Sequence, residues 1–161
     1  MAGLTDEDRA RYARHLTLPK VGEQGQSKLK QSRVFCVGAG GLGSPALLYL
    51  AAAGIGHLTV IDDDAIERSN LQRQIMHADD DVGISKAESA MLRLRELNPS
   101  ISIEVYAERL TSENAMMRVQ GHDIVLDGTD NIPTRYLIND VCELLGIPWV
   151  YGSIYRFEGQ V

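Results

Sequence analysis

The stretch RVFCVGAGGLGSPALLYLAAAG, residues 33–54, decides the fold of this chain. It holds a glycine-rich turn, Gly38 to Gly43, between an apolar run and an alanine-rich segment that has a proline near its start and Gly54 after its end. Proline in the first turn and glycine after the last turn mark the two ends of a helix. A G-x-G-x-x-G turn between a strand and a helix lets the backbone approach phosphate groups, and the helix N-terminus offers them free N–H groups. The stretch therefore predicts a strand–turn–helix unit that binds a nucleotide.

Apolar, strand-like runs alternate with helical patterns along the rest of the chain. The expected strands are residues 33–38, 58–62, 101–106, 124–127 and 149–152. The expected helices are residues 5–15, 25–31, 44–53, 86–98, 113–120 and 134–145. Apolar strands that alternate with helices are typical of a mainly parallel sheet with helices on both faces. We therefore expect a doubly wound, Rossmann-like α/β domain over residues 33–161, preceded by a helical arm over residues 1–32.

Composition sets outer limits on the function. The chain has 161 residues, enough for one domain with a real core, and no apolar run approaches the roughly 20 residues that span a bilayer. A net charge of −6 argues against a nucleic-acid-binding protein, whose basic surface should be visible. The N-terminal segment is too charged for a secretory signal, so we expect a cytoplasmic protein. The closing RFEGQV has no helix or polar tail after it, which is typical of a fragment of a longer protein.

The cysteines and histidines suggest no catalytic role. Cys36 and Cys142 lie in apolar segments and no CxxC pair is present, so we expect buried thiols rather than a zinc site or a redox pair. The four histidines have no ligand-like spacing. Nucleophile–base chemistry is therefore not expected from this chain.

Polar residues after the second expected strand bear on which nucleotide is bound. Asp62 ends that strand, where an acidic side chain can accept hydrogen bonds from ribose hydroxyls, and the glycine turn together with this acid would normally suggest NAD. Arg73 lies in SNLQRQ, residues 69–74, and Lys86 closes GISK at the start of the next helix. Each cation taken singly would be a solvated surface group. Clustered after the acid-tipped strand, they favour a clamp on phosphate oxygens.

Two carboxylates lie at the end of another buried strand, in VLDGTDN, residues 125–131. Carboxylates near a phosphate site are typical of Mg²⁺ binding, and we assign the ion to Asp130. The alternative is that Asp127 or Asp130 only caps the helix that follows. Both roles can coexist in one segment.

Six features in this order and spacing resemble the ThiF/MoeB/HesA family. They are RYARHL, GAGGLGS, the acidic run at residues 62–64, SNLQRQ, VGISK and DGTDN, and the resemblance extends from about residue 11 to the closing EGQV. The family consists of adenylating enzymes that are related to ubiquitin-activating enzymes. Its members usually continue into a part with paired CxxC zinc motifs and a reactive cysteine, and neither occurs in this sequence. Zinc is therefore expected only if a further C-terminal part carries such motifs.

The resemblance implies roles for particular residues. Asp62 would hold the ribose, Asp130 would bind Mg²⁺, and Arg14 would reach across a homodimer interface to the ATP of the partner subunit. The implied catalytic residues are Arg14, Arg73, Lys86 and Asp130. The implied nucleotide-binding residues are Gly38, Gly40, Gly41, Gly43, Asp62, Asp64, Ser69, Asn70, Leu71, Gln72, Arg73, Gln74, Lys86, Asp130 and Asn131.

The implied reaction is ATP-dependent adenylation of the C-terminal Gly-Gly carboxylate of a small ubiquitin-like sulfur carrier, MoaD-like or ThiS-like, in molybdopterin or thiamine biosynthesis. A C-terminal carboxylate has a pKa of about 3.5, so it is ionised at neutral pH and needs no general base. The site must then supply positioning and positive charge, which arginine, lysine and a Mg²⁺-binding aspartate provide. Three alternatives remain open: an NAD-dependent oxidoreductase, a tRNA-modifying dehydratase of the same superfamily, and a scaffold that binds nucleotide or carrier without turnover.

Overall fold

The computed structural model describes residues 3–161, and residues 1–2 of the predicted arm lie outside this range. The helices are α1 (Asp6–Arg11), α2 (Ala13–Leu16), α3 (Gly22–Gln31), α4 (Gly43–Ala53), α5 (Lys86–Leu97), α6 (Ala115–Val119) and α7 (Ile132–Leu145). The strands are β1 (Arg33–Val37), β2 (His57–Ile61), β3 (Ser102–Tyr106), β4 (Ile124–Asp127), β5 (Trp149–Tyr151), β6 (Ser153–Tyr155) and β7 (Glu158–Gln160). Two short 3₁₀ turns, η1 (Arg68–Asn70) and η2 (Asp79–Asp81), lie in the long connection between β2 and α5.

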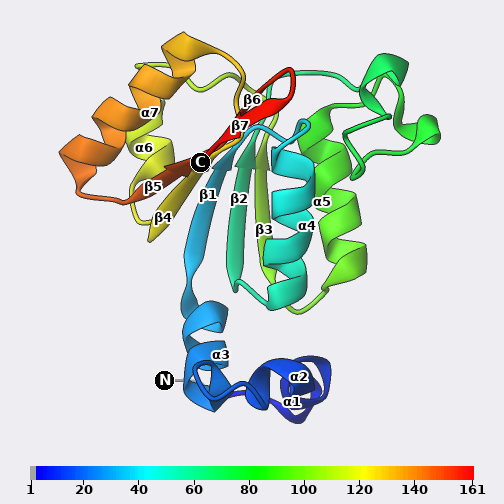
Figure 1. Cartoon of the computed structure of the whole chain (residues 1–161), viewed down its shortest axis with the longest axis vertical. Coiled ribbons are helices and arrows are strands. Elements are labelled where there is room, and N and C mark those ends of the chain that lie inside the picture. The colour runs from blue at the N-terminus through cyan, green and yellow to red at the C-terminus, as the bar shows by residue number, and fades with distance from the viewer. Residues whose placement is uncertain (1–2) are drawn as a thin grey trace.

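Five parallel strands form the central sheet in the order β3-β2-β1-β4-β5 (Figure 1). This order places β1 beside both β2 and β4, so the chain reverses its direction of winding between the two halves of the sheet. That reversal defines a doubly wound fold, and it opens a crevice at the carboxyl ends of β1 and β4. The predicted Rossmann-like fold is confirmed.

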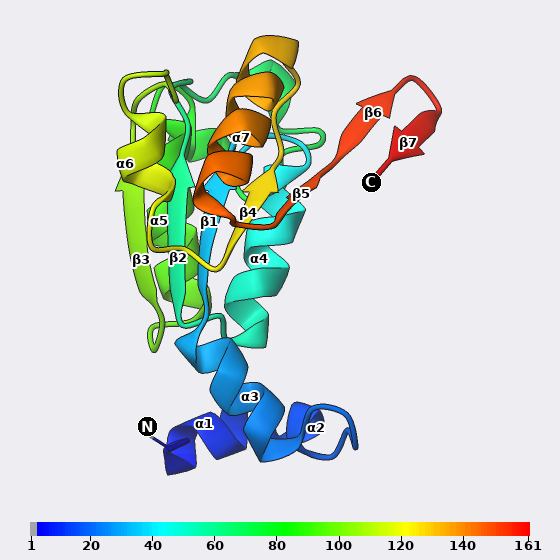
Figure 2. The same cartoon turned by 90° about the vertical axis from the view of Figure 1, so that its left-hand side faces the viewer.

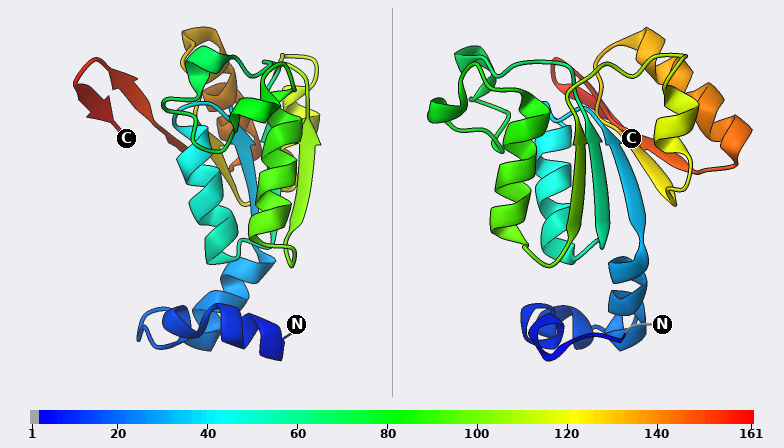
Figure 3. Two further views of the ribbon diagram at one scale, coloured as in Figure 1. Left: turned by 90° about the vertical axis from the view of Figure 1, so that its right-hand side faces the viewer. Right: turned by 180° about the vertical axis from the view of Figure 1, so that it is seen from behind.

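Each face of the sheet has its own apolar core, because successive residues of a strand point to opposite sides. Val34 faces α4 and α5, whereas the next residue, Phe35, faces α6 and α7. Figure 3 shows the two pairs of helices on the two faces. The first core contains Val34, Cys36, Leu47, Ala51, Leu58, Val60, Ala90, Leu94 and Ile103. The second contains Phe35, Val37, Ile61, Ala115, Val119, Val125, Ile138, Val141 and Cys142.

The N-terminal helices lie below the amino ends of the strands, away from the carboxyl edge of the sheet (Figure 2). Thr5 caps α1 with a reciprocal capping box, but the helix expected over residues 5–15 is interrupted at Tyr12. The side chain of Tyr12 is buried, and its hydroxyl accepts a hydrogen bond of 2.8 Å from Asn98 Nδ2 at the end of α5. Gln26 of α3, also buried, donates 2.9 Å to the Ala53 carbonyl at the end of α4. The interruption therefore lets the arm pack on the ends of both helices.

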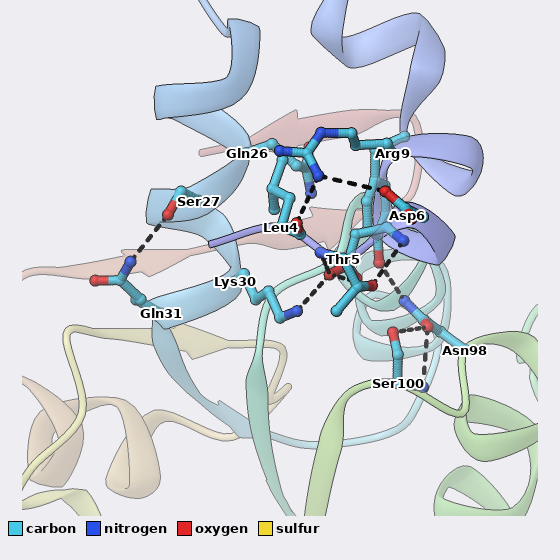
Figure 4. A network of polar contacts seen from close by, with 12 residues as sticks. Leu4, Thr5, Asp6, Arg9, Gln26, Ser27, Lys30, Gln31, Asn98 and Ser100 are labelled. Carbon is cyan, nitrogen blue, oxygen red and sulfur yellow. Dashed lines mark hydrogen bonds and ion pairs between the residues drawn. The ribbon is translucent and has the colours of Figure 1, made fainter. Parts of the chain in front are cut away.

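Asn98 and Lys30 extend this network of polar contacts, part of which appears in Figure 4. Asn98 Oδ1 accepts 2.7 Å from the Ser100 hydroxyl, and its amide also donates 2.8 Å to the Ala51 carbonyl. Lys30 pairs with the buried Asp8 carboxylate. These contacts fix the arm to the sheet domain.

The sequence predicts a strand over residues 149–152 and no further element, but the structure has two more strands after β5. After β5 the chain forms an antiparallel hairpin of β6 and β7, with Arg156 in its turn at φ 56°. The hairpin projects from the body of the domain (Figure 2). Within residues 3–161, no helix has both the length and the apolar character that crossing a membrane requires.

Candidate active site

A cleft of about 570 Å³ opens at the carboxyl ends of the parallel strands. Its walls are the turn between β1 and α4, parts of the connection from β2 to the start of α5, residues 108–110 after β3, the loop between β4 and α7 with the first turn of that helix, and the first residues of β6. The crevice predicted by the strand order therefore exists, and the glycine turn lies on its floor. The size matches that of a pocket for a small-molecule ligand.

The glycine turn is packed against the loop that follows β4. Gly38 has φ +93°, a backbone conformation that glycine adopts without strain, and its N–H donates 2.9 Å to the Ile61 carbonyl. A Cβ atom on Gly43 would lie 1.9 Å from the Gly38 carbonyl oxygen. Gly128 approaches both glycines, with a virtual Cβ 3.1 Å from Gly43 N. The turn can close this tightly only because these positions lack side chains.

Gly43→Ala is therefore expected to lower the free energy of unfolding by about 3 kcal/mol, the upper end of the usual range for overpacking. Gly41→Ala is the matched control, because its added methyl group would lie 3.5 Å from Arg73 Cδ, an ordinary contact distance. We expect the control to change stability by less than about 0.5 kcal/mol. Urea denaturation of both variants measures the difference. Equal midpoints for Gly43→Ala and the parent chain would refute the packing account.

Asp62 ties the glycine turn to the connection after β2. Its Oδ2 accepts 2.8 Å from the Ala39 amide, and its Oδ1 accepts 2.9 Å from the Asp64 amide. Burial raises the pKa of Asp62, although the two backbone amides act in the opposite direction. Each carboxylate oxygen keeps one lone pair that can accept a hydroxyl. Asp62 thus lies where a ribose-binding acid is expected.

Four cationic side chains line the cleft, and three of them face carboxylates. Lys86, buried at the start of α5, donates 2.7 Å to Asp64 Oδ2. Arg109 and Arg135 lie 3.6 Å from Asp63 and Asp127 respectively. Among residues 3–161, Arg73 has no carboxylate partner; its guanidinium donates 3.3 Å to the Ser69 carbonyl and lies over Gly41. Arg73 is therefore the cleft cation most available to an incoming anion.

The segment after β4 separates the two roles that the sequence left open. Asn131 caps α7, since its side chain accepts 3.0 Å from the Thr134 amide. Asp127 is buried and accepts from both the amide and the hydroxyl of Thr129, at 2.8 and 2.7 Å. Asp130 is exposed and lines the cleft. Neither aspartate caps the helix, and Asp130 is exposed in the cleft lining.

Most of the predicted site residues meet in the cleft. Gln74 is a clear case: it is 3% exposed, and its Oε1 has no hydrogen-bond donor among the described residues, so it can accept from a ligand. The predicted residues that line the cleft are Gly38, Gly40, Gly41, Asp62, Asp64, Arg73, Gln74, Lys86, Asp130 and Asn131.

The other predicted residues lie outside the cleft lining. They are Arg14, Gly43, Ser69, Asn70, Leu71 and Gln72. Gly43 acts through packing, and Asn70 Oδ1 accepts 3.0 Å from the Glu67 amide, which shapes the loop that carries Arg73. Arg14 is exposed on α2, in the arm at the opposite end of the sheet (Figure 2). Within one chain it does not reach the cleft, so its predicted action on a partner subunit stays a prediction.

Sequence reasoning missed two residues that support the site. His77 is buried beneath the glycine turn, where Nε2 lies 3.0 Å from the Ala39 carbonyl and Nδ1 lies 2.9 Å from the Ser89 hydroxyl. Arg135 lines the cleft from the first turns of α7. A signal for Arg135 was present, because a cation near a helix N-terminus opposes the helix dipole and needs a local reason. No comparable signal marks His77, whose neighbours come from distant parts of the chain.

The two cysteines do not take part in the site. Burial raises the pKa of Cys36 to about 12 and that of Cys142 to about 11, the latter with a contribution from the Asp127 charge. Both thiols are therefore protonated at neutral pH and poor nucleophiles. Neither lines the cleft.

A doubly wound sheet with a cation-lined cleft at its switch point is typical of the α/β domains that bind nucleotides. The chain belongs to the ThiF family: the sequence model of that family matches residues 12–161. The resemblance inferred from the six sequence features is confirmed.

Curated relatives share about half of the residues of this chain. It is 57% identical over 150 residues to the SAMP-activating enzyme E1 of Haloferax volcanii, covering 93% of this chain and 56% of that protein. It is 52% identical over 157 residues to the sulfur carrier protein adenylyltransferase of Thermus thermophilus, covering 98% and 58%. It is 54% identical over 158 residues to the adenylyltransferase and sulfurtransferase MOCS3 of Drosophila sechellia, covering 98% and 35%. The chain thus spans 35–58% of the length of these three relatives.

Solved structures resemble this chain over nearly its whole length. The E. coli tRNA N6-threonylcarbamoyladenosine dehydratase TcdA in complex with AMP has a TM-score of 0.88 at 30% identity, covering 97% of this chain and 65% of that one. E. coli MccB with AMPCPP and MccA has a TM-score of 0.80 at 30% identity, covering 93% and 44%. Both structures hold an adenine nucleotide or its analogue.

Proposed function

We propose that this chain binds ATP in the cleft and adenylates the C-terminal carboxylate of a ubiquitin-like sulfur carrier that ends in Gly-Gly. The observation that carries the proposal is the placement of Arg73 beside the glycine turn, with Lys86 and the Asp130 carboxylate lining the same cleft. The named functions of the Thermus and Drosophila relatives support it, as does the AMP bound to the TcdA domain.

The reaction needs only positioning and charge. A carboxylate oxygen of the carrier attacks the α-phosphorus of ATP, the bond from that phosphorus to the bridging oxygen of pyrophosphate breaks, and pyrophosphate leaves with the electron pair. Arg73 and Lys86 neutralise phosphate charge that builds up during this step. The nucleophile is already ionised, so no proton has to move, and the absence of a nucleophile–base pair from the cleft lining is no obstacle.

The residues present fit a Mg²⁺ ion at Asp130. Mg²⁺ prefers hard carboxylate oxygens and keeps several waters, and Asp130 offers an exposed carboxylate that no capping bond occupies. When bound, the ion would supply positive charge that offsets the negative charge of the phosphates. Asp62, Asp63 and Asp64 bring three more carboxylates close together, but Lys86 and Arg109 already face two of them. Asp130 is therefore the better candidate ligand.

A homodimer completes the proposal. Arg14 is exposed on an arm that is fixed to its own sheet domain, so its guanidinium can serve a cleft only in another subunit. The sulfur carrier protein and a second subunit of this chain would then meet at each active site.

Two alternatives rank lower. The dehydratase function is named for a structure 30% identical to this chain, whereas the relatives named as carrier-activating or adenylyltransferase enzymes are 52–57% identical. The NAD-dependent oxidoreductase rests on the glycine turn and Asp62 alone, and the described cleft adds cations suited to a triphosphate.

ATP–pyrophosphate exchange tests the proposal. Labelled pyrophosphate should enter ATP only when the chain is mixed with a carrier that ends in Gly-Gly, and a carrier shortened by its last glycine serves as the matched control. Calorimetric titrations with ATP and with NAD accompany the assay. Exchange that does not depend on the carrier, or NAD binding tighter than ATP binding, would overturn the proposal.

A further inference from the structure

Arg135 is a cation whose place on α7 is unfavourable with respect to the helix dipole. It lies in the first turns of α7, where the helix dipole repels positive charge. Its side chain is 23% exposed, and its Nε is buried without a hydrogen-bond acceptor among residues 3–161. A residue kept in such a place is expected to have a specific task in the structure.

Its guanidinium connects two walls of the cleft. Nη2 donates 2.6 Å to the Thr129 carbonyl and 3.0 Å to the Gly152 carbonyl. Thr129 directly precedes Asp130, and both residues line the cleft. Gly152 lies outside the lining but directly precedes Ser153, which is part of it. One side chain thus spans from the β4–α7 loop to the start of the projecting hairpin.

Asp127 holds the same loop from the other side. Its Oδ1 accepts from the Thr129 amide and hydroxyl, while its Oδ2 is buried and lies 3.6 Å from Arg135 Nε. Gly128 donates 2.9 Å to the Val37 carbonyl, and Gly152 donates 3.1 Å to the Asp127 carbonyl. The side chains of Asp127 and Arg135 add further hydrogen bonds to the loop. The buried Asp127 charge makes the Arg135 cation the natural partner, since a lone buried charge is costly.

We propose that Arg135 is a positioning residue, which locks the loop carrying Asp130 to the β5–β6 connection and so sets the separation of the two cleft walls. The clamp, meaning the two hydrogen bonds from Arg135 to the Thr129 and Gly152 carbonyls, does not depend on the proposed function. The expected effect of Arg135 on Mg²⁺ binding does rest on the proposed function. Lysine in this position would keep the charge for Asp127, but it lacks the planar fork of five donors. Arg135→Lys therefore separates the clamp from the buried charge pair.

Amide hydrogen exchange of the free chain tests the clamp without any assay of activity. In Arg135→Lys, exchange in peptides covering residues 128–131 and 152–155 should speed up by about tenfold, because local opening becomes easier. Arg93→Lys is the matched control, since Arg93 pairs with Asp81 and Glu96 outside the cleft. Unchanged exchange in both segments would overturn the proposal. Faster exchange throughout the chain would also overturn it, because it would indicate general destabilisation.

The Mg²⁺ dependence of ATP–pyrophosphate exchange tests the consequence for the site. Arg135→Lys should lower kcat by about tenfold to 100-fold through misplacement of Asp130, and should raise the Mg²⁺ concentration for half-maximal rate. A role in stability alone would leave that Mg²⁺ concentration unchanged, and this result would overturn the effect on Mg²⁺. If the parent chain shows no exchange at all, the proposed function fails, and the hydrogen-exchange result still decides on the clamp.

Discussion

Asp130→Asn is expected to lower carrier-dependent ATP–pyrophosphate exchange by about 100-fold, the size of effect seen when one preorganised electrostatic group is removed from an active site. Asparagine keeps the size of the side chain but removes the charge, and Mg²⁺ binds carboxylates in preference to amides. Because Asp130 is exposed and does not cap α7, the folded state should be unaffected. The measurement is the initial exchange rate at saturating ATP as a function of Mg²⁺ concentration.

Removal of the metal supplies the internal check. A chelator should reduce the parent chain to the rate of Asp130→Asn, and it should add little to the defect of the variant. Asp140→Asn is the matched control. Asp140 is an exposed aspartate on α7, the helix that follows Asp130, and it lies outside the cleft. If Asp130→Asn catalyses ATP–pyrophosphate exchange at the parental rate and with the parental dependence on Mg²⁺, Asp130 is not the Mg²⁺ ligand.

The sheet could be predicted because its signals are local. Apolar strands alternate with capped helices, and Gly54 and Gly146 close α4 and α7 in left-handed conformations, as the sequence indicates. The break at Tyr12 could not be predicted, because local propensity favours a continuous helix there. The break is stabilised by a buried hydrogen bond to Asn98, 86 residues away. The β6–β7 hairpin was missed for a related reason, since its segments are short and exposed and carry little periodic pattern.

The candidate site shows the same division. Arg73, Lys86 and Asp130 follow strands in sequence, so a parallel topology brings them to one edge without further information. The supporting contacts depend on tertiary structure: His77 reaches Ala39 from 38 residues away, and Arg135 reaches Gly152 from 17 residues away. Sequence spacing therefore identifies the groups that face a ligand better than the groups that hold them in place.

Arg14 is the predicted catalytic residue that one subunit cannot bring to its own cleft. Tyr12 and His15, on either side of it, both contact other parts of the chain: the Tyr12 hydroxyl contacts Asn98 of the sheet domain, and His15 Nδ1 lies 2.7 Å from Gln26 Oε1 of α3 in the arm. Arg14 between them is exposed. The arm contacts the ends of α4 and α5 at the amino edge of the sheet, whereas the cleft opens at the carboxyl edge. Any role in adenylation must therefore be in trans.

Subunit mixing is expected to show this directly. Arg14→Ala and Asp130→Asn should each lower exchange by about 100-fold as pure proteins. In a mixed dimer, the site with an intact Asp130 receives Arg14 from the Asp130→Asn subunit, so one of its two sites is complete and the other carries both lesions. Equal mixing of two freely exchanging subunits should therefore restore about a quarter of the parental rate, since half of the dimers are mixed.

Subunit exchange is checked separately, by native mass spectrometry of the mixed dimers. A mixture of the parent chain with the Asp130→Asn variant should have a rate that follows the fraction of intact Asp130, and this shows that the variant does not inhibit its partner. Recovery in the Arg14→Ala mixture that follows the fraction of mixed dimers requires the two residues to act in the same site from different chains. Failure to recover, with subunit exchange demonstrated, would rule out an action of Arg14 on the cleft of the partner subunit. Because the arm is fixed at the far end of the sheet from the cleft of its own chain, a structural contribution to the dimer would then be the only role left for Arg14.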